Sequence, residues 1–110
     1  MHKRITMRHM DHAPDVENYA NDALEKIIGA LEGEKTPVYV DLILEPGRPH
    51  AHHMAELLIK TPSFSIVFKQ EGPHIFQLID RVCDLAYRKI REEKKKKIND
   101  RRNGDSFKGV

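Results

Sequence analysis

The chain has 110 residues, of which 39% are hydrophobic and 33% are charged, and its formal net charge is +2. This length indicates one domain with a modest core, and the hydrophobic content with its periodic segments favours a globular over a disordered chain. The single cysteine, Cys83, excludes an internal disulfide framework and zinc sites built from several cysteines, so we expect a reducing compartment.

Residues 3–10 alternate in polarity, with Ile5 and Met7 on one side, and this predicts a short half-buried strand. Because the chain begins directly with this alternation, we expect no signal peptide. No hydrophobic run approaches the roughly 20 residues of a membrane span, so we expect a cytoplasmic protein without membrane contact.

A first helix is predicted from Pro14, a residue suited to the first helical position, up to Gly33, which ends it. Its hydrophobic face comprises Val16, Tyr19, Ala20, Ala23, Leu24, Ile27, Ile28 and Leu31. Three further strands are predicted at residues 38–45, 54–60 and 64–70. Residues 46–49 and 61–63 contain the prolines that separate these strands.

A second helix is predicted after Gly72 and Pro73, over residues 74–100. Its hydrophobic stripe comprises Ile75, Leu78, Ile79, Val82, Ala86 and Ile90. Two helices with one hydrophobic face each and four strands in the order β-α-β-β-β-α predict an α+β two-layer sandwich, with both helices packed on one face of the sheet. The opposite sheet face should be solvated. It carries Arg4, Arg8, Asp41, Glu56 and Lys60.

Charge is distributed unevenly along the chain. Residues 1–80 carry 8 Lys and Arg against 12 Asp and Glu, whereas residues 81–102 carry 10 against 4. A basic end on an acidic body favours a polyanion such as nucleic acid or an anionic surface, and the alternative is a helix end that only aids solubility. The second helix, at roughly 40 Å, is longer than a seven-residue strand of about 23 Å, so its basic end should overhang the sheet.

Within this helix Arg81, Arg88 and Lys95 are seven residues apart and should form an outward stripe, with Arg91 beside it. Asp84 can pair with Arg88 at a spacing of four. No strand carries the exposed aromatic pair that stacks single-stranded bases, so we expect structured RNA recognised by shape and charge.

Other chemistry has less support. His50, His52 and His53 form a candidate metal site, but no carboxylate or cysteine lies nearby in the sequence and adjacent histidines point apart in an extended chain. We expect a flexible, partly protonated loop there, and no metal or other cofactor. Cys83 should be an inert core thiol. No nucleophile elbow or phosphate-binding loop is present, so we expect neither an enzyme nor a small-molecule substrate.

The chain resembles the ribosome hibernation promoting factors, which include the ribosome-associated inhibitor A group. The resemblance covers roughly residues 3–97. It is carried by Ile5-Thr-Met-Arg-His-Met10, by Pro14, by residues 19–27 ending in Leu24-Glu-Lys-Ile27, by Ala55-Glu56, and by residues 72–80 continuing to Arg88-Lys-Ile-Arg91. It implies the same β-α-β-β-β-α fold, similar to double-stranded RNA-binding domains. It also implies binding to the small ribosomal subunit, through 16S-type rRNA near the decoding centre, and a block of messenger and transfer RNA binding in starvation or stationary phase.

The resemblance implies rRNA contacts by basic residues of the first strand, the end of the first helix and the second helix. These are Arg8, Lys26, Arg81, Arg88, Lys89, Arg91, Lys94, Lys95, Lys96 and Lys97. Relatives often carry basic residues where this chain has Glu17 and Asp22, which shifts the expected contacts onto the second helix. Ala13 stands where relatives have a capping Thr or Ser.

We expect one ribosome-binding domain at residues 1–102, a flexible tail at 103–110, and a monomer away from the ribosome. We also expect that it lacks the dimerisation domain of long relatives, and whether it promotes or opposes ribosome pairing stays open. Two other hypotheses remain. One is a protein-interaction or structured-RNA module that uses the polarised charge, including the acidic face of the first helix. The other is a metal sensor built on the histidine loop.

Overall fold

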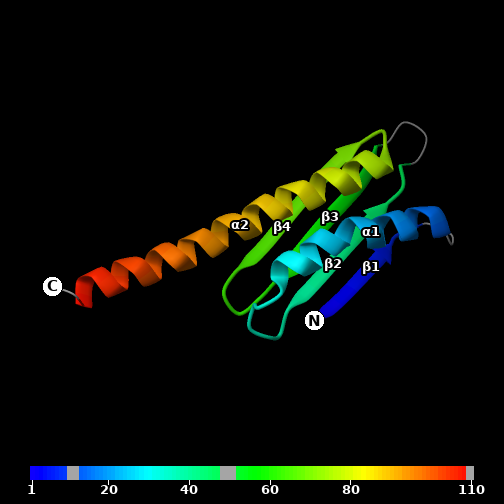
Figure 1. Cartoon of the computed structure of the whole chain (residues 1–110). Helices are drawn as coiled ribbons and strands as arrows, with labels where there is room; N and C mark the ends of the chain where they lie inside the picture. Colours follow the sequence, from blue (N-terminus) through cyan, green and yellow to red (C-terminus); the bar gives the residue numbers. More distant parts are fainter. Residues whose placement is uncertain (10–12, 48–51, 109–110) are drawn as a thin grey trace.

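The structure, a computed structural model, describes residues 1–9, 13–47 and 52–108, with side chains in the last helix described up to Lys96 and at Ile98. Its elements are β1 (His2–Met7), α1 (Pro14–Leu31), β2 (Tyr39–Glu45), β3 (His53–Lys60), β4 (Ser65–Gly72) and α2 (Ile75–Lys108). The strands form one layer and the two helices lie side by side on it as a second layer (Figure 1). The predicted α+β two-layer sandwich and its element order are therefore confirmed.

The sheet is mixed and its strand order is β1-β2-β3-β4. β1 pairs with β2 in parallel, while β2–β3 and β3–β4 are antiparallel pairs. β1 and β2 can be parallel because α1 lies between them in the sequence and returns the chain to the end of the sheet at which β1 begins. The register aligns Ile5, Leu42, Leu57 and Phe68 across all four strands, on the face that packs against the helices.

The core lies between the sheet and the helices, as the hydrophobic periodicity predicted. Each helix contributes one fully or almost fully buried row of side chains. These are Ala20, Leu24, Ile27 and Leu31 from α1, and Leu78, Ile79, Val82, Cys83, Ala86 and Ile90 from α2. Burial raises the pKa of the Cys83 thiol to about 11, so the thiol stays protonated at neutral pH and behaves as an inert core group, as expected.

α2 is much longer than the sheet that supports it. Its 34 residues extend about 51 Å, whereas an eight-residue strand extends about 26 Å. Ile90 is the last buried residue of its stripe, and the rest of α2 projects beyond the other elements (Figure 1). The predicted helix end near residue 100 is too early, because α2 continues to Lys108 through a segment that contains no proline. The flexible tail at 103–110 stays a prediction.

Among the described elements, none covers the other face of the sheet (Figure 1). This open face carries the charged residues predicted for it, but two hydrophobic residues among them, Ile43 and Met54, are buried by their neighbours. None of the described helices is both long enough and hydrophobic enough to span a membrane.

Candidate nucleic-acid interface

The outward side of α2 carries a row of cations, which we call the α2 stripe: Arg81, Arg88, Arg91 and Lys95. All four side chains are exposed, because they point away from the row that contacts the sheet. Within the described part of the chain, none of the four takes part in an ion pair. The predicted Asp84–Arg88 pair does not form, since Asp84 instead pairs with Lys26 of α1. The stripe is therefore available to bind phosphate.

Arg91 extends this stripe along the side that faces α1. Its guanidinium carbon lies 5.8 Å from the centroid of the Tyr87 ring, and the ammonium of Lys26 lies at the same distance from that ring. Contact with an aromatic ring attracts a cation without neutralising it. Arg91 is thus held in place while its charge remains available to an anion.

Three of the other lysines predicted to bind RNA are placed differently. The ammonium of Lys89 lies 3.3 Å from a carboxylate oxygen of Glu92 and 3.6 Å from one of Glu93, and Lys96 lies 3.5 Å from Glu93. The hydrogen bond and charge of Glu92 raise the pKa of Lys89. Lys94 is half-buried, and the Lys97 side chain lies outside the described residues. A phosphate would have to compete with these carboxylates for Lys89 and Lys96.

Lys26 belongs to the seam between the helices. It forms the ion pair with Asp84 of α2. One turn earlier in α2, Asp80 makes a second contact between the helices, in which the hydroxyl of Tyr19 donates to both carboxylate oxygens at 2.7–2.8 Å. This hydrogen bond raises the pKa of Tyr19. These two contacts between α1 and α2 join residues about 60 positions apart in the sequence. The sequence alone therefore could not identify Asp84 as the partner of Lys26.

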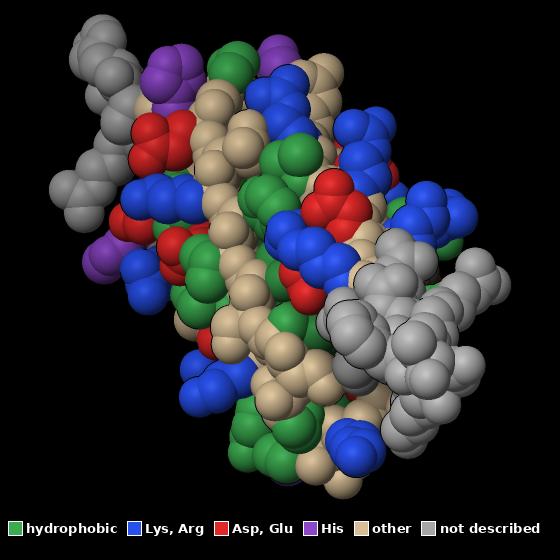
Figure 2. Space-filling view, turned by 90° about the vertical axis from the view of Figure 1, so that its left-hand side faces the viewer, with side chains coloured by type: hydrophobic (Ala, Val, Ile, Leu, Met, Phe, Trp, Pro, Cys, Tyr) green, Lys and Arg blue, Asp and Glu red, His purple; other side chains and the backbone are tan. Residues whose placement is uncertain are grey.

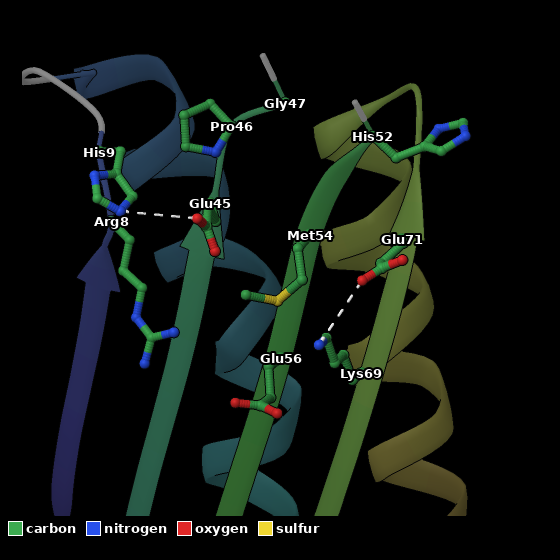
Figure 3. A pocket seen from close by; sticks show the side chains of 10 residues that line it. All are labelled: Arg8, His9, Glu45, Pro46, Gly47, His52, Met54, Glu56, Lys69 and Glu71. Carbon is green, nitrogen blue, oxygen red and sulfur yellow. Dashed lines mark ion pairs between the residues drawn. The ribbon is translucent and has the colours of Figure 1, made fainter. Parts of the chain in front are cut away.

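Arg8, the remaining predicted contact, lies on the open face of the sheet, in the layer opposite the helices. There it borders a hollow lined also by Glu45, Glu56, Lys69 and Glu71 (Figure 3). Lys69 pairs with Glu71 at 3.8 Å. The predicted RNA-binding residues therefore do not form one surface: Arg8 is separated from the α2 stripe by the thickness of the sandwich.

The histidine loop is only partly described. His53 accepts a hydrogen bond from the backbone N–H of Gly47 through Nδ1 at 2.7 Å, which closes the base of the loop. His52 is exposed, and His50 lies outside the described residues. In the part of the chain that the structure describes, no three His, Cys, Asp or Glu side chains gather as metal ligands.

No described strand by itself carries an exposed aromatic pair, but β1 and β2 together form one. His2 of β1 and Tyr39 of β2 form an exposed aromatic pair, with ring centroids 4.9 Å apart and planes inclined by 15°. The two residues are 37 positions apart, and only the parallel pairing of β1 with β2 makes them direct neighbours. The alternation of each strand could indicate exposure but not this pairing.

The molecule is not uniformly basic on the face seen from the C-terminal end. In Figure 2, Lys and Arg side chains are interspersed with Asp and Glu, and hydrophobic side chains lie between them. A local row of cations such as the α2 stripe is therefore a better candidate contact for an anion than net charge alone would indicate.

Comparisons with known proteins agree with this architecture. The family model of the sigma 54 modulation protein / S30EA ribosomal protein matches residues 4–98. The N-terminal domain of Protein Y from Thermus thermophilus has 16% identity and a TM-score of 0.62, with 84% of this chain and 98% of that one covered. A ribosomal subunit interface protein from Coxiella burnetii has 13% identity and a TM-score of 0.66, with coverage of 86% and 98%. No curated protein sequence matches the chain.

Proposed function

Because the chain belongs to the sigma 54 modulation protein / S30EA ribosomal protein family, we propose that it is a ribosome-associated hibernation factor that binds the small subunit. Family membership over residues 4–98 is the observation that carries this proposal. The solved structures that share the fold include one named as a ribosomal subunit interface protein. The α2 stripe supplies a surface with the charge that rRNA requires.

The proposed mechanism is steric and needs no catalysis or cofactor. Arg81, Arg88, Arg91 and Lys95 bind rRNA phosphates, and the release of counterions from the RNA drives association. The body of the protein then occupies the space near the decoding centre that messenger and transfer RNA use. In this proposal the protein is cytoplasmic, is monomeric away from the ribosome, and acts in starvation or stationary phase.

Co-sedimentation with purified small subunits tests this proposal. The wild-type protein should sediment with the subunits, and replacement of Arg81, Arg88 and Lys95 by glutamate should abolish the association. A matched pair of single variants removes the effect of net charge: Arg88→Glu should weaken binding far more than Lys35→Glu, an identical charge change at an exposed lysine between α1 and β2. Circular dichroism verifies that each variant is folded.

The steric mechanism has its own readout. Added protein should lower the binding of messenger and initiator transfer RNA to small subunits in a filter assay, and the triple glutamate variant should not. Absence of co-sedimentation, or equal losses for Arg88→Glu and Lys35→Glu, would contradict the RNA-binding surface. Co-sedimentation without any effect on messenger or transfer RNA would contradict the occlusion.

A second candidate function rests on the outward side of α1. Three exposed carboxylates lie there, at Asp15, Asp22 and Glu25, and the exposed Glu32 follows directly after the helix. This acidic row suits a basic protein segment rather than RNA, and it supports the alternative of a protein-interaction module. A pull-down from nuclease-treated lysate tests it: a stoichiometric partner lost on Asp22→Lys, but not on Arg88→Glu, would favour this alternative.

A further inference from the structure

The open face of the sheet carries an aromatic and basic row at the end where β1 begins. The strand register places His2, Tyr39 and Lys60 side by side on β1, β2 and β3. The rings of His2 and Tyr39 are stacked, and Tyr39 is 46% exposed despite its central strand. The core makes no use of this exposed ring, since the sheet residues that contact the helices point the other way.

A hollow lies directly beside the Tyr39 ring. Leu58 and Val67 provide hydrophobic lining, and Asp41, Lys60 and Ser65 provide polar groups. Val67 is 59% exposed, the most exposed of the large hydrophobic side chains in the described residues. A flat ligand could stack on Tyr39 and cover Val67, which would remove hydrophobic surface from water.

One cation lines this hollow, and a second lies beside it on β1. Lys60 lies next to Tyr39 in the row, and Arg4 lies one row along β1. Arg4 forms an ion pair with Asp41 at 3.1 Å, and Asp41 also accepts a hydrogen bond from the Thr6 hydroxyl, so a phosphate would compete with this carboxylate for Arg4. Lys60 is exposed and takes part in no ion pair within the described residues. A free cation beside an aromatic platform suits a ligand that carries both a planar ring and negative charge.

We propose that this surface, which we call the Tyr39 face (His2, Arg4, Tyr39, Leu58, Lys60 and Val67), binds an unpaired base of single-stranded RNA. The base stacks on Tyr39, and Lys60 binds the adjoining phosphate. A duplex does not fit this chemistry, because its bases are already stacked on one another. The Tyr39 face lies on the opposite layer from the α2 stripe, so it adds a second RNA contact that does not depend on the proposed function.

Fluorescence anisotropy with a labelled RNA of six adenosines tests the inference. The wild-type protein should bind saturably at low salt. Tyr39→Ala should weaken binding by about 5- to 150-fold, the range expected for loss of one base–aromatic stack. Tyr39→Phe keeps the ring and should bind within about twofold of wild type. Lys69→Ala, which removes an exposed cation at the other end of the open face, should also bind within about twofold.

Lys60→Ala provides a second variant that leaves the aromatic pair intact, so that the test stands even where Tyr39→Ala unfolds. It should weaken hexamer binding and lower its salt dependence. If the wild-type protein does not bind the hexamer saturably, the inference is overturned. This holds even if Tyr39→Ala weakens association with small subunits, because Tyr39 would then contact a ribosomal protein or an RNA duplex. Equal effects of Tyr39→Ala and Lys69→Ala overturn it as well.

The same variants separate this inference from the proposed function. Unchanged hexamer binding by Tyr39→Ala, with co-sedimentation still lost on replacing the α2 stripe, overturns the Tyr39 face alone. Hexamer binding that depends on Tyr39, with no association with small subunits, overturns the proposed function and supports the Tyr39 face.

Discussion

Arg88 and Lys89 are adjacent on α2, but alanine at each position should have different effects on RNA binding. Arg88 is exposed and makes no ion pair within the described residues, whereas Lys89 contacts both Glu92 and Glu93. Both substitutions remove one positive charge. The pair therefore compares a cation that is free to bind phosphate with one already engaged by carboxylates.

The magnitude follows from the number of phosphates that the α2 stripe can neutralise. With four contacts, the logarithm of the binding constant should fall with the logarithm of salt concentration at a slope of about −3.6, a loss of about 150-fold between 50 and 200 mM salt. Arg88→Ala leaves three contacts, with a slope of about −2.7 and a loss of about 40-fold. Lys89→Ala should keep the slope of the wild type.

The assay is a titration of each protein against small subunits at four or more salt concentrations, with circular dichroism to compare helix content. Lys89→Ala should lower helix content slightly, because it removes two ion pairs that span a turn of α2. Equal slopes for the two variants, or a wild-type slope near zero, would refute the assignment of phosphate binding to free cations of α2.

Two further predictions concern stability, both measured by urea unfolding. The pKa of Cys83 is raised to about 11 in the folded protein, so the unfolded chain releases its thiol proton at a lower pH than the folded protein does. The free energy of unfolding should therefore fall by up to about 2.7 kcal/mol as pH rises from about 9 to 11. Cys83→Ala should show a smaller fall over this range, and identical pH profiles would contradict the prediction. Gly33→Ala should lower the free energy of unfolding by about 1–2 kcal/mol, because Gly33 has a φ of +87° that an L residue rarely adopts. Gly29→Ala inside α1 should raise the free energy of unfolding by up to about 1 kcal/mol. An added methyl group meets open space at both sites. Equal effects at the two glycines would show that backbone conformation does not decide the outcome.

The elements themselves were predictable because their signals are local. The hydrophobic stripe of α2 and the alternation of β2 each repeat within one element, and each pattern predicts which side of that element is buried. Boundaries were less accurate. β4 continues to Gly72, two residues past its predicted end, because its antiparallel register with β3 continues up to His53. That register depends on a second segment and is not visible in either strand alone.

The candidate site was predictable only as a set of residue types. The sequence placed Arg81, Arg88 and Lys95 on one side of a helix, and the structure agrees, since helical spacing alone determines this. It could not show that Lys26 is engaged by Asp84, or that Arg8 lies on the opposite layer. Those facts depend on how separate elements pack.

The sequence by itself determined the order of the elements and their buried faces. It also determined the uneven charge that places a basic row on an overhanging helix. Each of these features depends on spacing within a continuous segment. Only the tertiary structure decided which cations remain free and which are paired, and it assembled His2 and Tyr39 into a stacked pair on the open face. The physical reason is that ion pairs and ring contacts act over a few ångströms, and the fold alone brings residues from distant segments that close together.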